Sequence, residues 1–153
     1  MNDYGLRSKI KNKFPIEFNV EGKETYLIFT FPSKPDSDYR FILYLYEEGN
    51  LSIGAELINN SSNYYFWSRL IEQYSKRTVE EMQSEAIDVL GKILRYDTKI
   101  VQKKGWLFWH FSCQYEVNGH FESVGGNSTL KFPSVKVPNP GLSKKVYHSK
   151  ALL

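Results

Sequence analysis

The sequence predicts an α+β protein in which one curved antiparallel sheet of about seven or eight strands carries two helices on one face. Two observations predict this class. Short runs of alternating apolar and polar residues, rich in tyrosine, phenylalanine and tryptophan, occur on both sides of a central segment. The central segment, residues 62–95, instead repeats its apolar residues at intervals of three and four, as amphipathic helices do. The expected order is therefore a β-meander, two helices and then β-hairpins.

Four strands are expected before the helices, joined by short polar turns, at residues 16–21, 25–31, 39–46 and 51–58. Residues 1–14 are expected to form a basic lead-in with a short helical turn around Leu6 to Ile10. Residues 138–153 show no periodic face and are expected to form an extended tail. The 153 residues therefore make up a single domain, residues 1–153, which is long enough to bury a hydrophobic core.

The two helices are expected at about 62–76 and 79–95. In the first, apolar residues fall at helical spacing, namely Phe66, Trp67, Leu70, Ile71 and Tyr74. The second begins with a capping box, in which the Thr78 hydroxyl and the Glu81 carboxylate each accept a hydrogen bond from the other residue's backbone N–H. Its apolar stripe follows at Val79, Met82, Ala86, Val89, Leu90 and Ile93.

The strongest strand signal is the long aromatic run that ends at Asn118-Gly119. Both residues of this pair tolerate the positive φ angles of a type I′ turn, so the pair predicts a β-hairpin. A two-residue loop would pair Val117 with His120, whereas a three-residue loop would pair Val117 with Phe121. The sequence leaves both registers open.

Residues that could support catalysis or bind a metal do not occur in a suitable pattern. His110, His120 and His148 are far apart, and the spacings that zinc sites use are missing from the sequence. The single cysteine, Cys113, lies on the apolar side of a strand and His110 on the other side, so they cannot form a nucleophile–base pair. We therefore interpret Cys113 as a small buried side chain and expect no enzymatic activity, cofactor or metal.

The N-terminal segment lacks the apolar region of a secretory signal, and the chain has no run of about 18 apolar residues that could span a membrane. A cytoplasmic protein without membrane contact is expected.

Charge is distributed unevenly although the net charge is only +3. Residues 47–88 contain eight acidic and three basic residues, a net charge of −5. After Glu122 there is no acidic residue, and five lysines follow. Such asymmetry can mark a binding surface, although acids at a helix start are also favoured by the helix dipole.

The sequence also resembles a known class of bacterial protein. The resemblance involves the run Gly54-Ala-Glu-Leu57, then Tyr65-Phe-Trp67, a helix and Trp106-Leu-Phe-Trp109. In architecture and composition over residues 40–125, the chain resembles the immunity proteins of polymorphic-toxin and contact-dependent inhibition systems. That resemblance implies a small cytoplasmic protein that neutralises one cognate toxin by binding it, without catalysis. Many such toxins are nucleases with basic clefts, which an acidic face would attract and block. The residues expected to contact this partner are Glu47, Glu48, Glu56, Tyr64, Tyr65, Glu72, Glu80, Glu81, Glu85 and Asp88.

Two other functions fit the sequence. A curved aromatic sheet covered by helices could enclose a small apolar ligand. Alternatively, the basic C-terminal region could bind nucleic acid, with lysines along a sheet edge and aromatic side chains as stacking surfaces. Nucleic acid is the less favoured partner, because such binders usually keep acidic residues off the whole face and carry a higher net charge.

Overall fold

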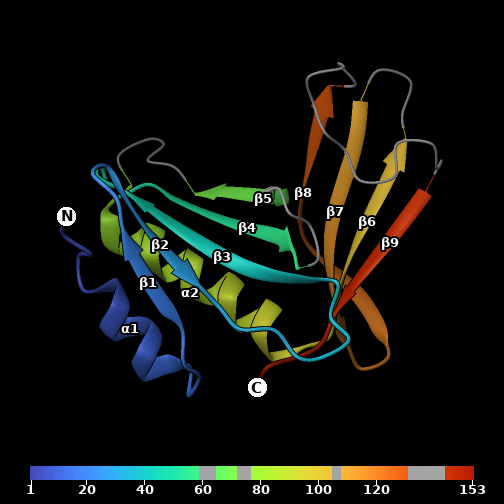
Figure 1. Cartoon of the computed structure of the whole chain (residues 1–153), viewed down its shortest axis with the longest axis horizontal. Helices are drawn as coiled ribbons and strands as arrows, with labels where there is room; N and C mark the ends of the chain where they lie inside the picture. Colours follow the sequence, from blue (N-terminus) through green and yellow to red (C-terminus); the bar gives the residue numbers. More distant parts are fainter. Residues whose placement is uncertain (59–64, 72–76, 105–107, 131–143) are drawn as a thin grey trace.

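The computed structural model describes residues 1–58, 65–71, 77–104, 108–130 and 144–153 (Figure 1). Within these ranges the chain forms two helices and nine strands: α1 (Leu6–Lys13), β1 (Asn19–Gly22), β2 (Tyr26–Thr30), β3 (Tyr39–Tyr46), β4 (Leu51–Leu57), β5 (Tyr65–Ile71), α2 (Val79–Arg95), β6 (Thr98–Lys104), β7 (Phe108–Val117), β8 (His120–Leu130) and β9 (Lys144–Ser149). The α+β class and the antiparallel pairing are confirmed. The prediction of one sheet is wrong, because the strands form a five-stranded and a four-stranded sheet.

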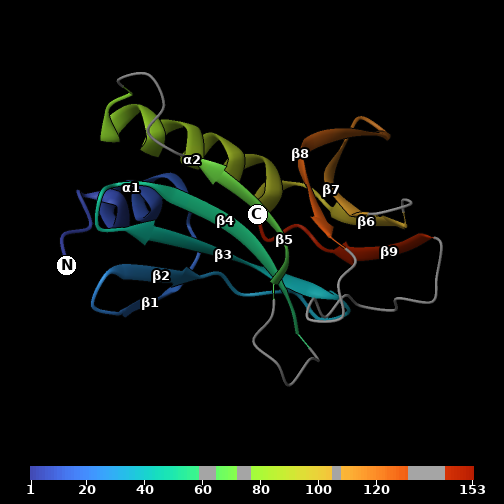
Figure 2. The ribbon, with the colours of Figure 1, turned by 90° about the horizontal axis from the view of Figure 1, so that it is seen from above.

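The five-stranded sheet is a meander in the order β1-β2-β3-β4-β5, so the expected meander is confirmed and extended by one strand. Both helices lie on one face of it (Figure 2). The side chains on that face are apolar and buried, among them Leu27, Phe29, Leu43, Leu45 and Ile53. They are placed there by alternation along each strand and by direct pairing across strands, such as Phe29 with Leu43 and Leu43 with Ile53.

Helix α2 confirms the second predicted helix. Thr78 caps it, because the Thr78 hydroxyl accepts a hydrogen bond from the Glu81 N–H at 3.1 Å and the Glu81 carboxylate accepts one from the Thr78 N–H at 2.8 Å. The predicted stripe faces the sheet, with buried side chains at Met82, Ala86, Val89, Leu90 and Ile93.

The first predicted helix, residues 62–76, is wrong where the structure describes it. Tyr65–Ile71 is strand β5, paired with β4, and residues 62–64 and 72–76 lie outside the described ranges. Trp67 and Ile71 are buried, whereas Leu70, expected on the apolar side of a helix, is 59% exposed. Burial therefore follows the period of two that belongs to a strand.

The other helix of the structure, α1, lies in the segment that was predicted to be a lead-in with a short helical turn. Its apolar residues Leu6 and Ile10, and Phe14 directly after it, are fully buried. Phe14 lies close to Gly91 of α2, and the Lys9 ammonium donates a hydrogen bond to the Gln83 side chain at 2.7 Å. Helix α1 is thus part of the core.

The four-stranded sheet has the order β8-β7-β6-β9. Val117 pairs with His120 across Asn118 and Gly119, whose φ angles are 51° and 81°, so the two-residue loop is the register that forms. Residues 144–149 of the expected C-terminal tail form β9, which pairs with β6 and so adds a strand to this sheet.

The two sheets lie against each other near the middle of the molecule (Figure 1). Side chains of both sheets contact each other there. The Trp67 indole N–H of β5 donates to the Gly125 carbonyl of β8 at 3.4 Å. The Tyr39 hydroxyl of β3 lies 2.6 Å from the Thr98 hydroxyl of β6, and both side chains are buried. Because these contacts connect distant strands, the two sheets share one continuous core.

Candidate partner-binding surface

The fold brings the turn between β3 and β4 against the start of α2. Gly49, in a left-handed conformation with φ 88°, sits so close to α2 that an added Cβ would lie 2.7 Å from a Val79 methyl carbon. The exposed acids that precede Gly49, Glu47 and Glu48, therefore belong to the turn that packs against the first turn of α2, which carries Glu80 and Glu81. Four acidic residues of the sequence prediction thus belong to one surface, the acidic patch.

Tyr4 is an aromatic side chain in the same place. Its hydroxyl donates to the Glu47 backbone carbonyl at 2.7 Å, and its own carbonyl accepts from the Gln83 side-chain amide at 3.4 Å. The Tyr4 side chain is 38% exposed. Sequence reasoning missed Tyr4, because nothing in residues 1–14 indicates that this segment reaches the β3–β4 turn.

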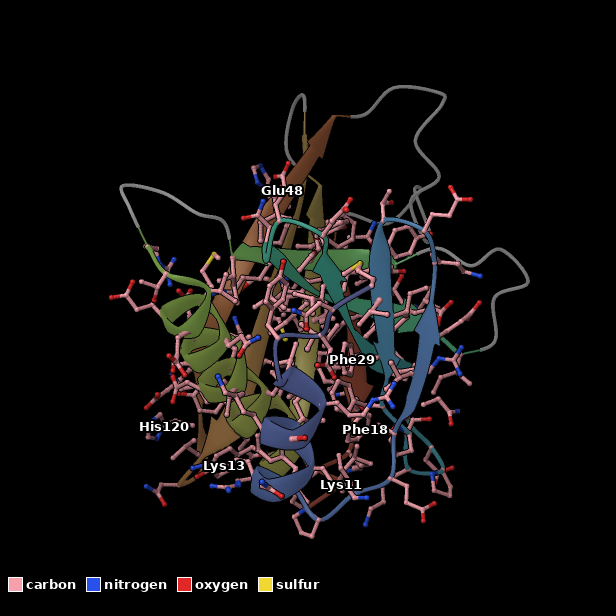
Figure 3. All side chains as sticks on the ribbon, turned by 90° about the vertical axis from the view of Figure 1, so that its left-hand side faces the viewer. Lys11, Lys13, Phe18, Phe29, Glu48 and His120 are labelled. Carbon is pink, nitrogen blue, oxygen red and sulfur yellow. The ribbon has the colours of Figure 1, made fainter. Side chains whose placement is uncertain are left out.

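The four carboxylates of the acidic patch differ in the ion pairs and hydrogen bonds that they form. Glu80 pairs with the Lys9 ammonium at 3.3 Å, and Glu81 caps α2. Within the part of the chain that the structure describes, the side chains of Glu47 and Glu48 form no ion pair, and both are exposed. In Figure 3, Glu48 lies near the top of the view, and Lys11 and Lys13 lie near the bottom. Glu47 and Glu48 are therefore exposed charges that no ion pair among the described residues compensates.

The other predicted acids that the structure describes serve internal contacts. Glu56, one of the residues expected to contact the partner, is only 8% exposed and binds the Arg40 guanidinium at 2.9 Å. Asp88 pairs with Lys92 one turn along α2 at 3.2 Å. Glu85 bridges Arg69 of β5 and Arg77.

The electrostatics of Glu85 follow from that bridge. Partial burial raises the pKa of the Glu85 carboxyl, but hydrogen bonds from Arg77 and Arg69 outweigh it and lower the pKa below the usual value. The Glu85 charge is thus compensated within the chain by the guanidinium groups of Arg69 and Arg77. Of the two predicted tyrosine contacts, Tyr65 belongs to β5, while Tyr64 lies outside the described residues together with Glu72.

The structure also shows the environment of Cys113. Its side chain is fully buried, which raises the pKa of the thiol far above its usual value, and it pairs with Ile100 and Gly125 of the neighbouring strands. Its interpretation as a small buried side chain is confirmed. Among the residues that the structure describes, no three His, Cys, Asp or Glu side chains are grouped as a metal ion would require.

None of the helices in the described ranges has the length and hydropathy needed to cross a bilayer. Comparison of the chain with protein-family models, with curated proteins and with solved structures gave no match.

Proposed function

We propose that this chain is a non-enzymatic binding protein that neutralises a basic partner protein, in the way of the immunity proteins that its sequence resembles. The observation that supports the proposal is the juxtaposition of the β3–β4 turn with the start of α2. It brings the segment of Glu47 and Glu48 to the start of α2, which carries Glu80 and Glu81, and the Tyr4 hydroxyl is bonded to the Glu47 carbonyl. Lys9 is the one cation paired with any of these carboxylates in the described part of the chain.

Glu47 and Glu48 would steer a basic partner towards this surface. Exposed charges that are not neutralised internally increase association rates by about 10- to 1,000-fold when the partner has the opposite charge. Tyrosine is among the side chains that most often dominate protein interfaces, so Tyr4 supplies an apolar anchor inside the charged rim. A nuclease with a basic cleft is a partner of this chemistry.

The experiment uses the protein encoded by the neighbouring reading frame, produced in an inactive form, as the candidate partner. The affinity of the full chain is compared with that of the Glu47→Lys/Glu48→Lys variant by calorimetric titration. We expect about a tenfold or greater loss of affinity, because reversal turns attraction into repulsion at the rim. Glu81 is left unchanged because its carboxylate caps α2, so reversing it would lower stability as well.

The matched control is Glu17→Lys/Glu116→Lys, which changes the net charge equally at two exposed carboxylates remote from the acidic patch. This control should bind within about threefold of the unaltered chain, as expected for charges outside the interface. Equal losses in both variants would show that only net charge matters and would remove the acidic patch as the binding site.

A further inference from the structure

The second charged surface lies on the four-stranded sheet, at the opposite end of the molecule from α1 (Figure 1). Strand β6 lies between β9 and β7, and Lys103 of β6 pairs directly with Lys144 of β9 and with His110 of β7. Directly paired residues of adjacent strands point to the same face, with their Cβ atoms about 4.5–5.5 Å apart. The register therefore places two ammonium groups side by side.

Lys103 and Lys144 are both exposed, and in the described ranges neither forms an ion pair. Like charges directly opposite each other destabilise a sheet, so this pair is unfavourable for the isolated protein. The acids of β7 and β8, Glu116 and Glu122, lie at the other end of these strands, beside the Asn118-Gly119 turn. The sequence contains no acidic residue after Glu122 that could compensate.

A third lysine extends this charge along the same face. Lys99 precedes Lys103 by four residues of β6, a distance of about 13 Å in a strand, and pairs with His148 of β9. Its ammonium nitrogen lies 3.7 Å from the centroid of the Phe121 ring, which is 40% exposed. We call Lys99, Lys103 and Lys144 the lysine face.

Between the two cationic positions lies an apolar pair, Val101 of β6 and Val146 of β9, in which Val101 is buried and Val146 is partly exposed. Asp38 and Glu116 are the acids near the Lys99 end, and the Asp38 carboxylate is held by the His148 backbone N–H at 2.7 Å. Lys103 and Lys144 are thus separated from Lys99 by one partly exposed valine, and the exposed ring of Phe121 lies beside Lys99.

We propose that the lysine face binds the backbone of a single-stranded nucleic acid. Such a strand carries one phosphate per nucleotide, so it can contact lysines about 13 Å apart and relieve the repulsion between Lys103 and Lys144. Its unstacked bases can pack against the part of the Phe121 ring that the Lys99 ammonium leaves exposed. The three lysines lie on the face of an antiparallel sheet rather than on a helix or at the tip of a hairpin, which favours a single strand over the groove of a duplex.

This site is separate from the acidic patch and does not depend on the proposed function. Antiparallel pairing places Lys103 of β6 and Lys144 of β9 at one end of the sheet and the acids Glu116 and Glu122 at the other. Lys99 lies nearer to these acids, because its ammonium contacts the ring of Phe121, the residue paired with Glu116.

The test measures binding of the full chain to a fluorescently labelled 20-nucleotide oligothymidylate and to the matching RNA, by fluorescence anisotropy at several salt concentrations. Three phosphates neutralised on a single strand predict a slope of log affinity against log salt of about −2. The variant Lys99→Glu/Lys103→Glu/Lys144→Glu should lose at least about tenfold in affinity and most of that slope. The matched control, Lys11→Glu/Lys13→Glu/Lys34→Glu, changes three exposed lysines elsewhere to the same net charge and should keep both.

Circular dichroism of both variants establishes that they fold. Equal losses in the two triple variants, or affinity that does not vary with salt, would overturn the site. Tighter binding of a duplex of the same length, or of a heparin fragment of similar charge, would overturn the assignment to single-stranded nucleic acid.

Discussion

Replacing Gly49 by alanine tests the contact on which the acidic patch depends. Alanine at a left-handed φ of 88° costs about 1–2 kcal/mol in backbone strain. The added Cβ would also lie 2.7 Å from Val79 Cγ2. Val79 is β-branched and helical, with one strongly preferred rotamer, so it cannot turn away cheaply, and such overlap typically costs about 1–3 kcal/mol. The expected loss in the free energy of unfolding is therefore about 2–5 kcal/mol.

Gly119→Ala is the matched control. Gly119 has a similar φ of 81°, but nothing lies within 4 Å of an added Cβ, so only the backbone term of about 1–2 kcal/mol applies. Urea unfolding gives both losses as shifts of the midpoint at constant slope. In a chain of this size each kcal/mol lowers the melting temperature by about 2–4 °C.

The difference between the two variants measures the contact between the turn and α2. Equal losses at Gly49 and Gly119 would refute the close approach and, with it, the placement of Glu47 beside Glu80. Adding Val79→Ala to the Gly49→Ala variant should recover part of the difference, because the smaller side chain leaves room for the new Cβ. If the losses in the free energy of unfolding from Gly49→Ala and Val79→Ala simply add in the double variant, that result would contradict the contact as well.

Two further predictions concern the ends of the chain. Ile10→Ala should lower the free energy of unfolding by about 2–4 kcal/mol because Ile10 is fully buried, whereas Arg7→Ala on the exposed side of α1 should cost less than about 0.5 kcal/mol. Hydrogen bonding from the Ala151 backbone N–H, together with Lys150, holds the pKa of the Asp97 carboxyl below its usual value. The stabilisation that the ionised Asp97 carboxylate adds to the folded state is complete above the unfolded-state pKa of about 4. It is lost as the pH falls through the lower folded-state pKa. Asp97→Asn should therefore destabilise by about 1 kcal/mol or less at neutral pH, and the gap to the unaltered chain should close during acid titration; a gap that is independent of pH would contradict this.

The wrong helix at 62–76 shows where apolar spacing alone is ambiguous. Trp67 and Ile71 are four residues apart, a separation that suits one face of a helix and equally one face of a strand. Leu70 and Arg69 decide between them, because Leu70 is exposed while Arg69 reaches the Val124 carbonyl of the other sheet. That partner lies 55 residues further along the chain, so no local pattern could reveal it.

Helix α1 was underestimated for a different reason. Leu6, Ile10 and Phe14 recur at intervals of four, which is a helical pattern, but the basic residues around them make the segment look solvated. The structure resolves this conflict by burying one narrow stripe against α2 and leaving the charged side chains outside. Capping and turn signals were more reliable, since the Thr78 capping box and the Asn118-Gly119 turn depend only on residues within a few positions of one another.

Charge was the weakest guide to the candidate site, because a charge sum ignores which partners the register supplies. Arg40 and Glu56 are 16 residues apart but directly paired on β3 and β4, so their charges cancel within the protein. At Lys103 and Lys144 the register of β6 and β9 instead pairs two like charges, and among the described residues neither forms an ion pair with a carboxylate. The sequence shows only which segments are acidic or basic. Strand pairing then decides which of these charges are compensated within the protein and which remain on its surface. Both binding proposals stand on charges that remain after this internal pairing is taken into account.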